Sequence, residues 1–202
     1  MHTLMLGDRF QDVLAKAASG EATAFADLWC DAHPDLVRYL RVLAGAHAED
    51  VASETWLKVI ARIDSFSGTE DGFRAWLVTI ARNTYVDLLR RPQQRSEVSV
   101  SDLRSFEGTP TDRLSDTASL VIDRLSTDAA LEVIARLPHD QAEMIMLRVA
   151  MGLTVSEVAA IMSKSPGAVR VSVHRGLKQL EGLLRQAGVT PEAGIPLLSR
   201  DG

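Results

Sequence analysis

The chain has 202 residues, a hydrophobic content of 46% and a formal net charge of −5, which fits one medium or two small packed domains. Aromatic residues make up 5% of the chain and strand-like alternation is scarce, so we predict an all-α fold. The acidic balance argues against a protein that coats nucleic acid without selectivity, and the single cysteine excludes an internal disulfide.

Targeting signals also limit the possible classes of protein. We find neither a signal-peptide pattern nor an apolar run of about 18 residues in the sequence. We therefore expect a soluble, cytoplasmic protein without membrane insertion.

Residues 8–44 predict two helices separated at Ser19-Gly20. Pro34 predicts a bend or a break in the second helix, and Gly45 predicts its end. We expect Cys30 to be a buried structural thiol, with a redox sensor as the alternative. The apolar side of the second helix is formed by Phe25, Leu28, Trp29, Leu36, Tyr39, Leu40 and Leu43.

Residues 47–63 predict a strongly amphipathic helix. Its expected core stripe consists of Ala52, Trp56, Val59, Ile60 and Ile63. Another face carries Asp50, Ser53, Glu54 and Leu57. Ordinary solvation would explain the acidic residues, but an apolar side chain beside carboxylates also suits a partner that offers apolar and basic groups.

Residues 64–72 predict a loop rich in Ser and Gly, and residues 73–91 predict a long helix. Phe66 in the loop either packs into the core or contacts an unstacked base. The side chains expected to pack inward are Phe73, Trp76, Leu77, Ile80, Ala81, Thr84, Leu88 and, as an open alternative, Tyr85. A basic face interleaved with amide and aromatic groups could hold phosphates and exposed bases; it consists of Arg74, Arg82, Asn83, Tyr85, Arg90 and Arg91, with Asp87 as its anion.

The helical pattern fades after Pro92. Residues 92–128 contain four cations and seven anions, which predicts a flexible acidic linker up to about Ser115. Periodicity then returns, and Pro138 is expected to open a helix that Gly152 closes. Its inward residues are Ile145, Met146 and Val149.

Residues 153–180 predict two helices joined by a tight turn. Ser165 can cap the second helix, and Pro166 suits its first position. The buried residues are expected to be Val155, Val158, Ala159 and Met162 in the first helix and Val169, Val173, Leu177 and Leu180 in the second. Residues 166–185 carry four cations and one anion, so a DNA-binding helix-turn-helix is favoured over a helical hairpin with a solvated basic face.

Three segments together resemble the extracytoplasmic-function (ECF) group of bacterial sigma-70-type sigma factors. They are AEDVASETWLKV from Ala48, FRAWLVTIARNTYVDLLRR from Phe73, and the run from Leu137 to Leu180 that contains LTVSEVAAIM and VHRGLKQL. The order and spacing of the three segments carry the resemblance over residues 8–185. It implies sigma domain 2 at residues 8–92, a linker at 93–117, sigma domain 4 at 118–185 and a disordered tail at 186–202.

The resemblance also implies roles for the residues singled out above. Sigma factors of this group bind RNA polymerase core through the β′ clamp helices and the β subunit, recognise promoter DNA and promote its opening. The core-binding residues would be Asp50, Ser53, Glu54 and Leu57. The −10 element would be read by Phe66, Arg82, Asn83, Tyr85, Asp87, Arg90 and Arg91. The −35 element would be read by Ser165, Arg170, Val171, Ser172, His174, Arg175 and Lys178.

An anti-sigma factor is a further partner that the resemblance implies. The alternative function is a stand-alone helix-turn-helix regulator, which would leave the basic helix at 73–91 and the acidic linker unexplained. An enzyme is not favoured, because the five histidines and Cys30 show no metal-ligand spacing and no activated nucleophile is evident. We therefore expect no catalytic residues, no metal and no cofactor.

Overall fold

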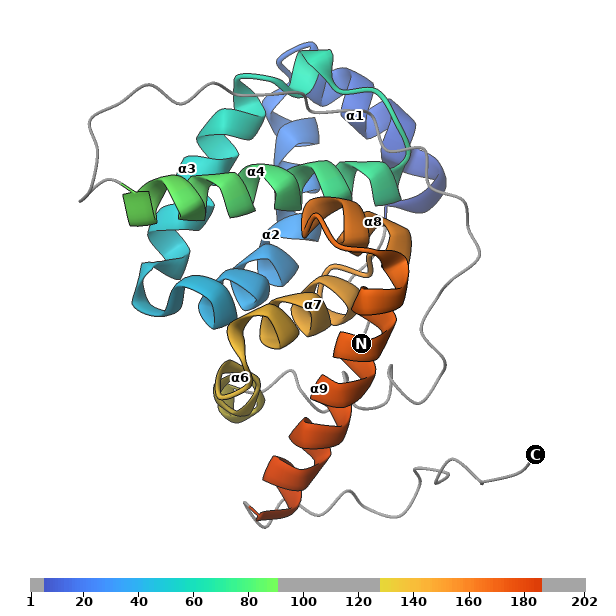
Figure 1. Ribbon diagram of the computed structural model, residues 1–202. Helices are drawn as coiled ribbons and strands as arrows, with labels where there is room; N and C mark the ends of the chain where they lie inside the picture. The colour runs from blue at the N-terminus through green and yellow to red at the C-terminus, as the bar shows by residue number, and fades with distance from the viewer. Residues whose placement is uncertain (1–5, 91–127, 187–202) are drawn as a thin grey trace.

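The structure is a computed structural model that describes residues 6–90 and 128–186, all of whose regular elements are helices (Figure 1). The predicted all-α fold is confirmed for this part of the chain. The linker at 93–117 lies outside the described residues, as does nearly all of the tail. The elements are η1 (Gly7–Arg9), α1 (Phe10–Ala18), α2 (Ala22–Ala44), η2 (Gly45–His47), α3 (Ala48–Ile60), η3 (Ile63–Ser65), α4 (Glu70–Arg90), α6 (Asp128–Ala135), α7 (His139–Val149), α8 (Val155–Ile161) and α9 (Pro166–Gln186).

Helix α2 is the centre of the packing. It contacts α1, α3 and α4 on the N-terminal side of the chain and α6 and α7 on the C-terminal side, and Figure 1 shows these helices around it. Leu36, Tyr39 and Leu40 are each 0% exposed. Burying a side chain of this size contributes about 1.5–3 kcal/mol, so α2 ties the two helical regions into one core.

Several boundaries agree with the sequence. Helices α1 and α2 are separated at Ser19-Gly20 as predicted, and Gly45, with φ of 56°, ends α2. Pro34, however, lies inside an uninterrupted helix, so the alternative of a break is wrong. Its missing N–H removes one helical hydrogen bond, and the buried residues on both sides keep the helix continuous.

The predicted inward face of residues 25–60 is partly wrong. Trp29 is 40% exposed, Ile60 is 53% exposed and Cys30 is exposed, although all three were expected in the core. The buried stripe of α2 passes through Leu28, as predicted, and through Ala32 rather than Trp29. Each of α2 and α3 therefore exposes a large apolar side chain that was expected in the core, and the thiol is accessible.

Helix α4 begins earlier than predicted. It starts at Glu70 rather than Phe73, because Thr69 accepts the N–H of Gly72 through its hydroxyl and the N–H of Phe73 through its carbonyl. Glu70 and Asp71 place negative charge in the first turn, where the helix dipole favours it. The sequence Thr-Glu-Asp-Gly contains this start signal.

Candidate nucleic-acid and protein interfaces

Helix α9 buries one face and exposes another, as the sequence predicted. Val169, Val173 and Leu180 are at most 7% exposed, and Leu177 is half-buried. The Oγ of Ser165 accepts the N–H of Ala168 at 3.2 Å, so the predicted cap is present. The outer face presents exposed Arg170, Val171, His174, Arg175 and Lys178 beside half-buried Ser172.

The turn between α8 and α9 has a defined geometry. Ser163 adopts a left-handed φ of 53°, the N–H of Lys164 donates to the carbonyl of Ala159, and that of Ser163 donates to Ala160. These paired bonds form a Schellman motif, which ends α8. The Lys164 ammonium lies 2.9 Å from Asp140 and holds the pKa of that carboxyl below its usual value, so the turn is also tied to α7.

The first helix of this pair is held at its start by a motif that the sequence analysis missed. The hydroxyl of Thr154 accepts the N–H of Glu157, and the Glu157 carboxylate accepts the N–H of Thr154 at 2.7 Å. This is a capping box, and its signature Thr-x-x-Glu stands in the sequence. It sets where α8 begins and therefore how the helix pair is oriented.

Helix α4 places the proposed reading residues at its surface. Asn83 and Arg90 are exposed, whereas Arg82, Tyr85 and Asp87 are half-buried; Arg91 lies outside the described residues. The Asp87 carboxylate lies 3.9 Å from the Lys58 ammonium of α3. The described face is thus polar and carries charges of both signs. Arg82 lies toward its N-terminal end and Arg90 toward its C-terminal end, with Asp87 between them.

Arg74 is not part of that face. It is 8% exposed, and its guanidinium lies 3.0 Å from Asp31, 3.5 Å from Asp35 and 3.8 Å from Glu70. The prediction that it contributes to a basic surface is wrong, because α2 supplies two carboxylates to the inner side of α4. Its role in this structure is within the core.

Phe66 packs against other rings. Its ring centroid lies 5.0 Å from that of Trp76 and 5.6 Å from that of Phe73, and the side chain is half-buried. This arrangement favours the packing alternative for Phe66. Phe66 lies in the loop that leads into α4, and part of its ring is still exposed. A contact between this exposed part and a base stays a prediction.

Helix α3 presents the predicted acidic and apolar face. Leu57 is 68% exposed, Asp50 and Ser53 are exposed, and Glu54 is half-buried with its carboxylate 3.6 Å from the Lys58 ammonium. Ile60 extends the apolar part of this face by nearly one turn. The four proposed core-binding residues therefore lie on one accessible side of α3.

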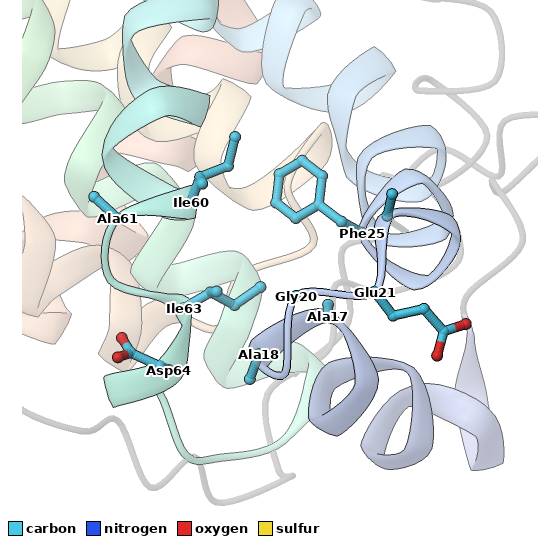
Figure 2. Close-up of a pocket in the computed structure, with 10 residues that line it drawn as sticks. Ala17, Ala18, Gly20, Glu21, Phe25, Ile60, Ala61, Ile63 and Asp64 are labelled. Carbon is cyan, nitrogen blue, oxygen red and sulfur yellow. The ribbon is translucent and has the colours of Figure 1, made fainter.

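An open recess adjoins this face between the α1–α2 turn and the end of α3. Figure 2 shows Phe25, Ile60 and Ile63 among its lining, with the carboxylates of Glu21 and Asp64 at its edges. The recess thus repeats the chemistry of the α3 face, an apolar surface bordered by negative charge. A partner helix with apolar and basic side chains fits both.

Residues 31–96 match the family of sigma-70 region 2, and residues 127–180 match sigma-70 region 4. The chain is 36% identical over 181 residues to the ECF RNA polymerase sigma factor BldN of Streptomyces coelicolor, a match that spans 87% of this chain and 66% of BldN. It is 33% identical to the ECF sigma factor ShbA of Streptomyces griseus, over 85% of this chain and 93% of ShbA.

The chain is an ECF sigma factor. Two solved structures share the fold of this sigma factor. CnrH, in complex with the cytosolic domain of CnrY, matches with a TM-score of 0.58 and 25% identity, over 89% of this chain and 99% of CnrH. RpoE of Bartonella quintana, in complex with the anti-sigma factor NepR, matches with a TM-score of 0.54 and 25% identity, over 81% of this chain and 98% of RpoE.

One contact in the sigma factor joins the two matched regions and was missed by the sequence analysis. Glu143 of α7 accepts hydrogen bonds from Tyr39 of α2 at 3.0 Å and from Arg82 of α4 at 2.8 Å. Tyr39 and Arg82 are 104 and 61 residues away from Glu143 in the sequence, and no local pattern around a helical glutamate indicates such distant partners. It could only be found once the packing of α7 was known.

Within the described residues of the sigma factor, no three His, Cys, Asp or Glu side chains are grouped so as to hold a metal ion. The same residues include no helix long and apolar enough to cross a membrane. His33 accepts a hydrogen bond from the Trp56 indole at 3.2 Å, and burial lowers its pKa. The His33 side chain therefore contributes to packing, and its Nδ1 already accepts the hydrogen bond from Trp56.

Proposed function

We propose that this ECF sigma factor binds RNA polymerase core, recognises the −10 and −35 elements of promoters and promotes DNA opening. The observation that carries the proposal is that one chain matches both sigma-70 region 2, which contains α4, and sigma-70 region 4, which contains α9. A stand-alone regulator needs the second helix but gives no role to the first. The proposed function is binding and strand selection, without catalysis by the chain itself.

Helix α9 is proposed to read the −35 element. Its N-terminal half would enter the major groove, as the second helix of a helix-turn-helix does. Arg170, Arg175 and Lys178 supply cations for phosphates or guanine edges, while Val171, Ser172 and His174 face the bases, and Ser165 lies at the entry to the helix. The exposure of this face and the buried anchor residues behind it support the assignment.

Helix α4 and the preceding loop are proposed to read the −10 element. Asn83 and Tyr85 offer an amide and a ring to an unstacked base, Arg82, Arg90 and Arg91 offer cations to phosphates, and Asp87 accepts hydrogen bonds. Phe66 would add an edge of its ring to a base pocket beside Trp76. These roles follow the family resemblance, and the positions of the described residues on α4 support them.

The α3 face is proposed to dock on the polymerase core. Asp50, Ser53, Glu54 and Leu57 would contact the clamp helices of β′, with the recess beside Ile60 extending the contact. Region 4 would lie near the β subunit. We place residues 8–92 and 118–185 as the two domains, 93–117 as the linker and 186–202 as a tail, all acting in the cytoplasm.

An anti-sigma factor is proposed as a regulatory partner. RpoE was solved with the anti-sigma factor NepR bound, and CnrH was solved in complex with the cytosolic domain of CnrY. Similarity in fold over at least 81% of this chain makes the same class of partner the natural expectation here. The surface it would use is not assigned.

Reversing two charges on α3 tests the docking proposal. Asp50→Arg with Glu54→Arg should reduce capture of purified polymerase core by at least tenfold, because like charge on a docking surface costs several kcal/mol. The matched control is Asp8→Arg with Glu132→Arg, which changes the net charge equally at two exposed positions. Capture of core by the α3 variant at the level of the control would contradict the proposal, provided circular dichroism shows both variants folded.

A further inference from the structure

Val171 is an apolar side chain on the outer side of α9. It is 49% exposed, whereas Val169 and Val173, two residues before and after it, are 0% and 7% exposed. Two residues correspond to about 200° around a helix, so Val171 lies opposite the buried stripe that anchors α9. Packing among the described residues therefore leaves this valine uncovered.

The surface next to Val171 is open toward the start of the helix. The Cα–Cβ bond of a helical residue tilts toward the N-terminus, so Val171 leans over Gly167 and Ala168, which precede it by about one turn. Both residues are exposed, and a Cβ added to Gly167 would meet nothing within 4 Å. A flat surface can therefore reach the valine methyl groups from this side without first meeting a longer side chain.

The charges around Val171 indicate the kind of partner. His174 and Arg175 follow it by three and four residues and share its face of the helix, and Lys178 lies one turn farther on; all three are exposed. Residues 166–180 include no Asp or Glu. A partner with negative charge on either side of a small apolar group fits this face, and the phosphates and base edges of a DNA groove have that arrangement.

The chemistry of valine limits which base it can select. Its side chain has no hydrogen-bond donor or acceptor, so it can discriminate between bases only through apolar contact. In the major groove, thymine presents a C5-methyl group, whereas the distinguishing groups of guanine, cytosine and adenine are donors and acceptors. Covering those polar groups with valine would remove their water without replacing its hydrogen bonds. An A·T pair with its methyl group toward Val171 is thus the favoured partner.

We propose that Val171 contacts the C5-methyl group of a thymine in the −35 element and selects an A·T pair at that position. The proposal rests on the −35 role of α9 given under the proposed function. Val171 lies in the second turn of α9, and the N-terminal residues of a recognition helix are those that reach base edges. Arg175 and Lys178 then bind phosphates and fix the register of the valine on the bases.

The contact is tested with the full chain assembled on purified polymerase core. The probes are two versions of a promoter that this assembly transcribes, one with thymine and one with deoxyuridine in the −35 element. Deoxyuridine pairs as thymine does but has no C5-methyl group. Competition against a fluorescent promoter measures both affinities. The native chain should bind the deoxyuridine duplex roughly fourfold more weakly, the loss expected for one buried methyl group.

Val171→Ala assigns the effect to this residue. The variant should bind the thymine duplex more weakly than the native chain does, and it should bind the thymine and deoxyuridine duplexes equally. Its fold should be intact, because the position is exposed and alanine has the higher helix propensity; circular dichroism checks this. The matched control is Gln179→Ala, at an exposed position farther along α9, which should keep the native preference for thymine.

Equal binding of the two duplexes by the native chain would overturn the methyl contact. A preference for thymine that persists in Val171→Ala would overturn the role of Val171, as would −35 elements without a thymine. Reduced capture of core by Val171→Ala, with its thymine preference unchanged, would show that a protein covers the valine instead. Each of these results leaves transcription from specific start sites intact, whereas failure of the proposed function would abolish those start sites.

Discussion

Arg74 shows how a single residue can be charged and yet belong to the core. The Glu70 carboxylate beside it also accepts the N–H groups of Leu6 and Gly7, each at 3.0 Å. The guanidinium thus links α4 to α2, and Glu70 links α4 to the start of the described chain. Three carboxylates share this buried cation, but Asp35 also pairs with Arg38 at 2.8 Å, so loss of the cation would leave the buried Asp31 carboxylate without its ion pair.

Replacing Arg74 by methionine should therefore destabilise the protein strongly. Breaking a buried ion pair from one side costs about 3–5 kcal/mol, and we expect Arg74→Met to lower the free energy of unfolding in urea by that amount. The control is Arg38→Met. Its side chain is 39% exposed beside Asp35, so it should cost about 1 kcal/mol or less.

The effect of Arg74→Met should also depend on pH. Burial raises the pKa of Asp31 in the folded protein, and Arg74 opposes that rise. Without Arg74, the folded state binds protons more tightly than the unfolded state, so its stability falls as pH increases above the usual aspartate range. The destabilisation should be larger at about pH 7 than at about pH 5; equal destabilisation at the two values would contradict this account.

At the scale of elements, the crossing of α7 and α9 depends on a glycine. A Cβ added to Gly176 would lie 2.7 Å from Cδ1 of Ile145, and Ile145 is 0% exposed. The two helices can approach this closely because Gly176 has no side chain. Gly182, on the same helix, has open space around it.

The two glycines should respond oppositely to alanine. Gly182→Ala should stabilise the protein by about 0.5–1 kcal/mol, because alanine has the higher helix propensity. Gly176→Ala gains the same propensity but forces Ile145 to move, at a cost of about 1–3 kcal/mol, so it should be neutral to destabilising. Thermal unfolding measures both, and equal stabilisation by the two changes would show that the crossing is not tight.

The same elements show what could be predicted from the sequence. The period of apolar residues placed the buried stripe of α9 through Val169 and Val173, because that pattern is local. The outward positions were harder to predict. Ile60 and Trp29 are apolar yet exposed, whereas Arg74 is charged yet buried. Whether each of these side chains is buried depends on which neighbouring helix covers it. The apolar periodicity of one segment does not indicate how other helices pack against it.

The proposed interface residues divide in the same way. The exposure of Asp50 and Ser53 on α3 and of Arg170 and Arg175 on α9 could be predicted, because these polar residues lie away from the buried stripes of amphipathic helices. The bond between Glu143 and Arg82 could not, since it joins helices from two regions that are distant in sequence. Thr154 and Glu157 form an intermediate case, in which a recognisable motif was present in the sequence and was overlooked.

For the whole molecule, the distribution of charge matters more than its sum. The chain has a net charge of −5, but its described surface combines an acidic and apolar face on α3 with exposed cations on α9. An acidic chain of this kind is not held on DNA by bulk electrostatics. Promoter selection would then require the two helices proposed to read DNA, α4 and α9, to be positioned by the polymerase.

Transcription by purified polymerase core tests this central claim most directly. Core, with and without the protein, would transcribe genomic DNA from the source organism, and sequencing of RNA 5′ ends would locate the start sites. We predict start sites that appear only with the protein and that share two upstream elements at a fixed spacing. If the protein adds no start sites and does not associate with core, the account is contradicted.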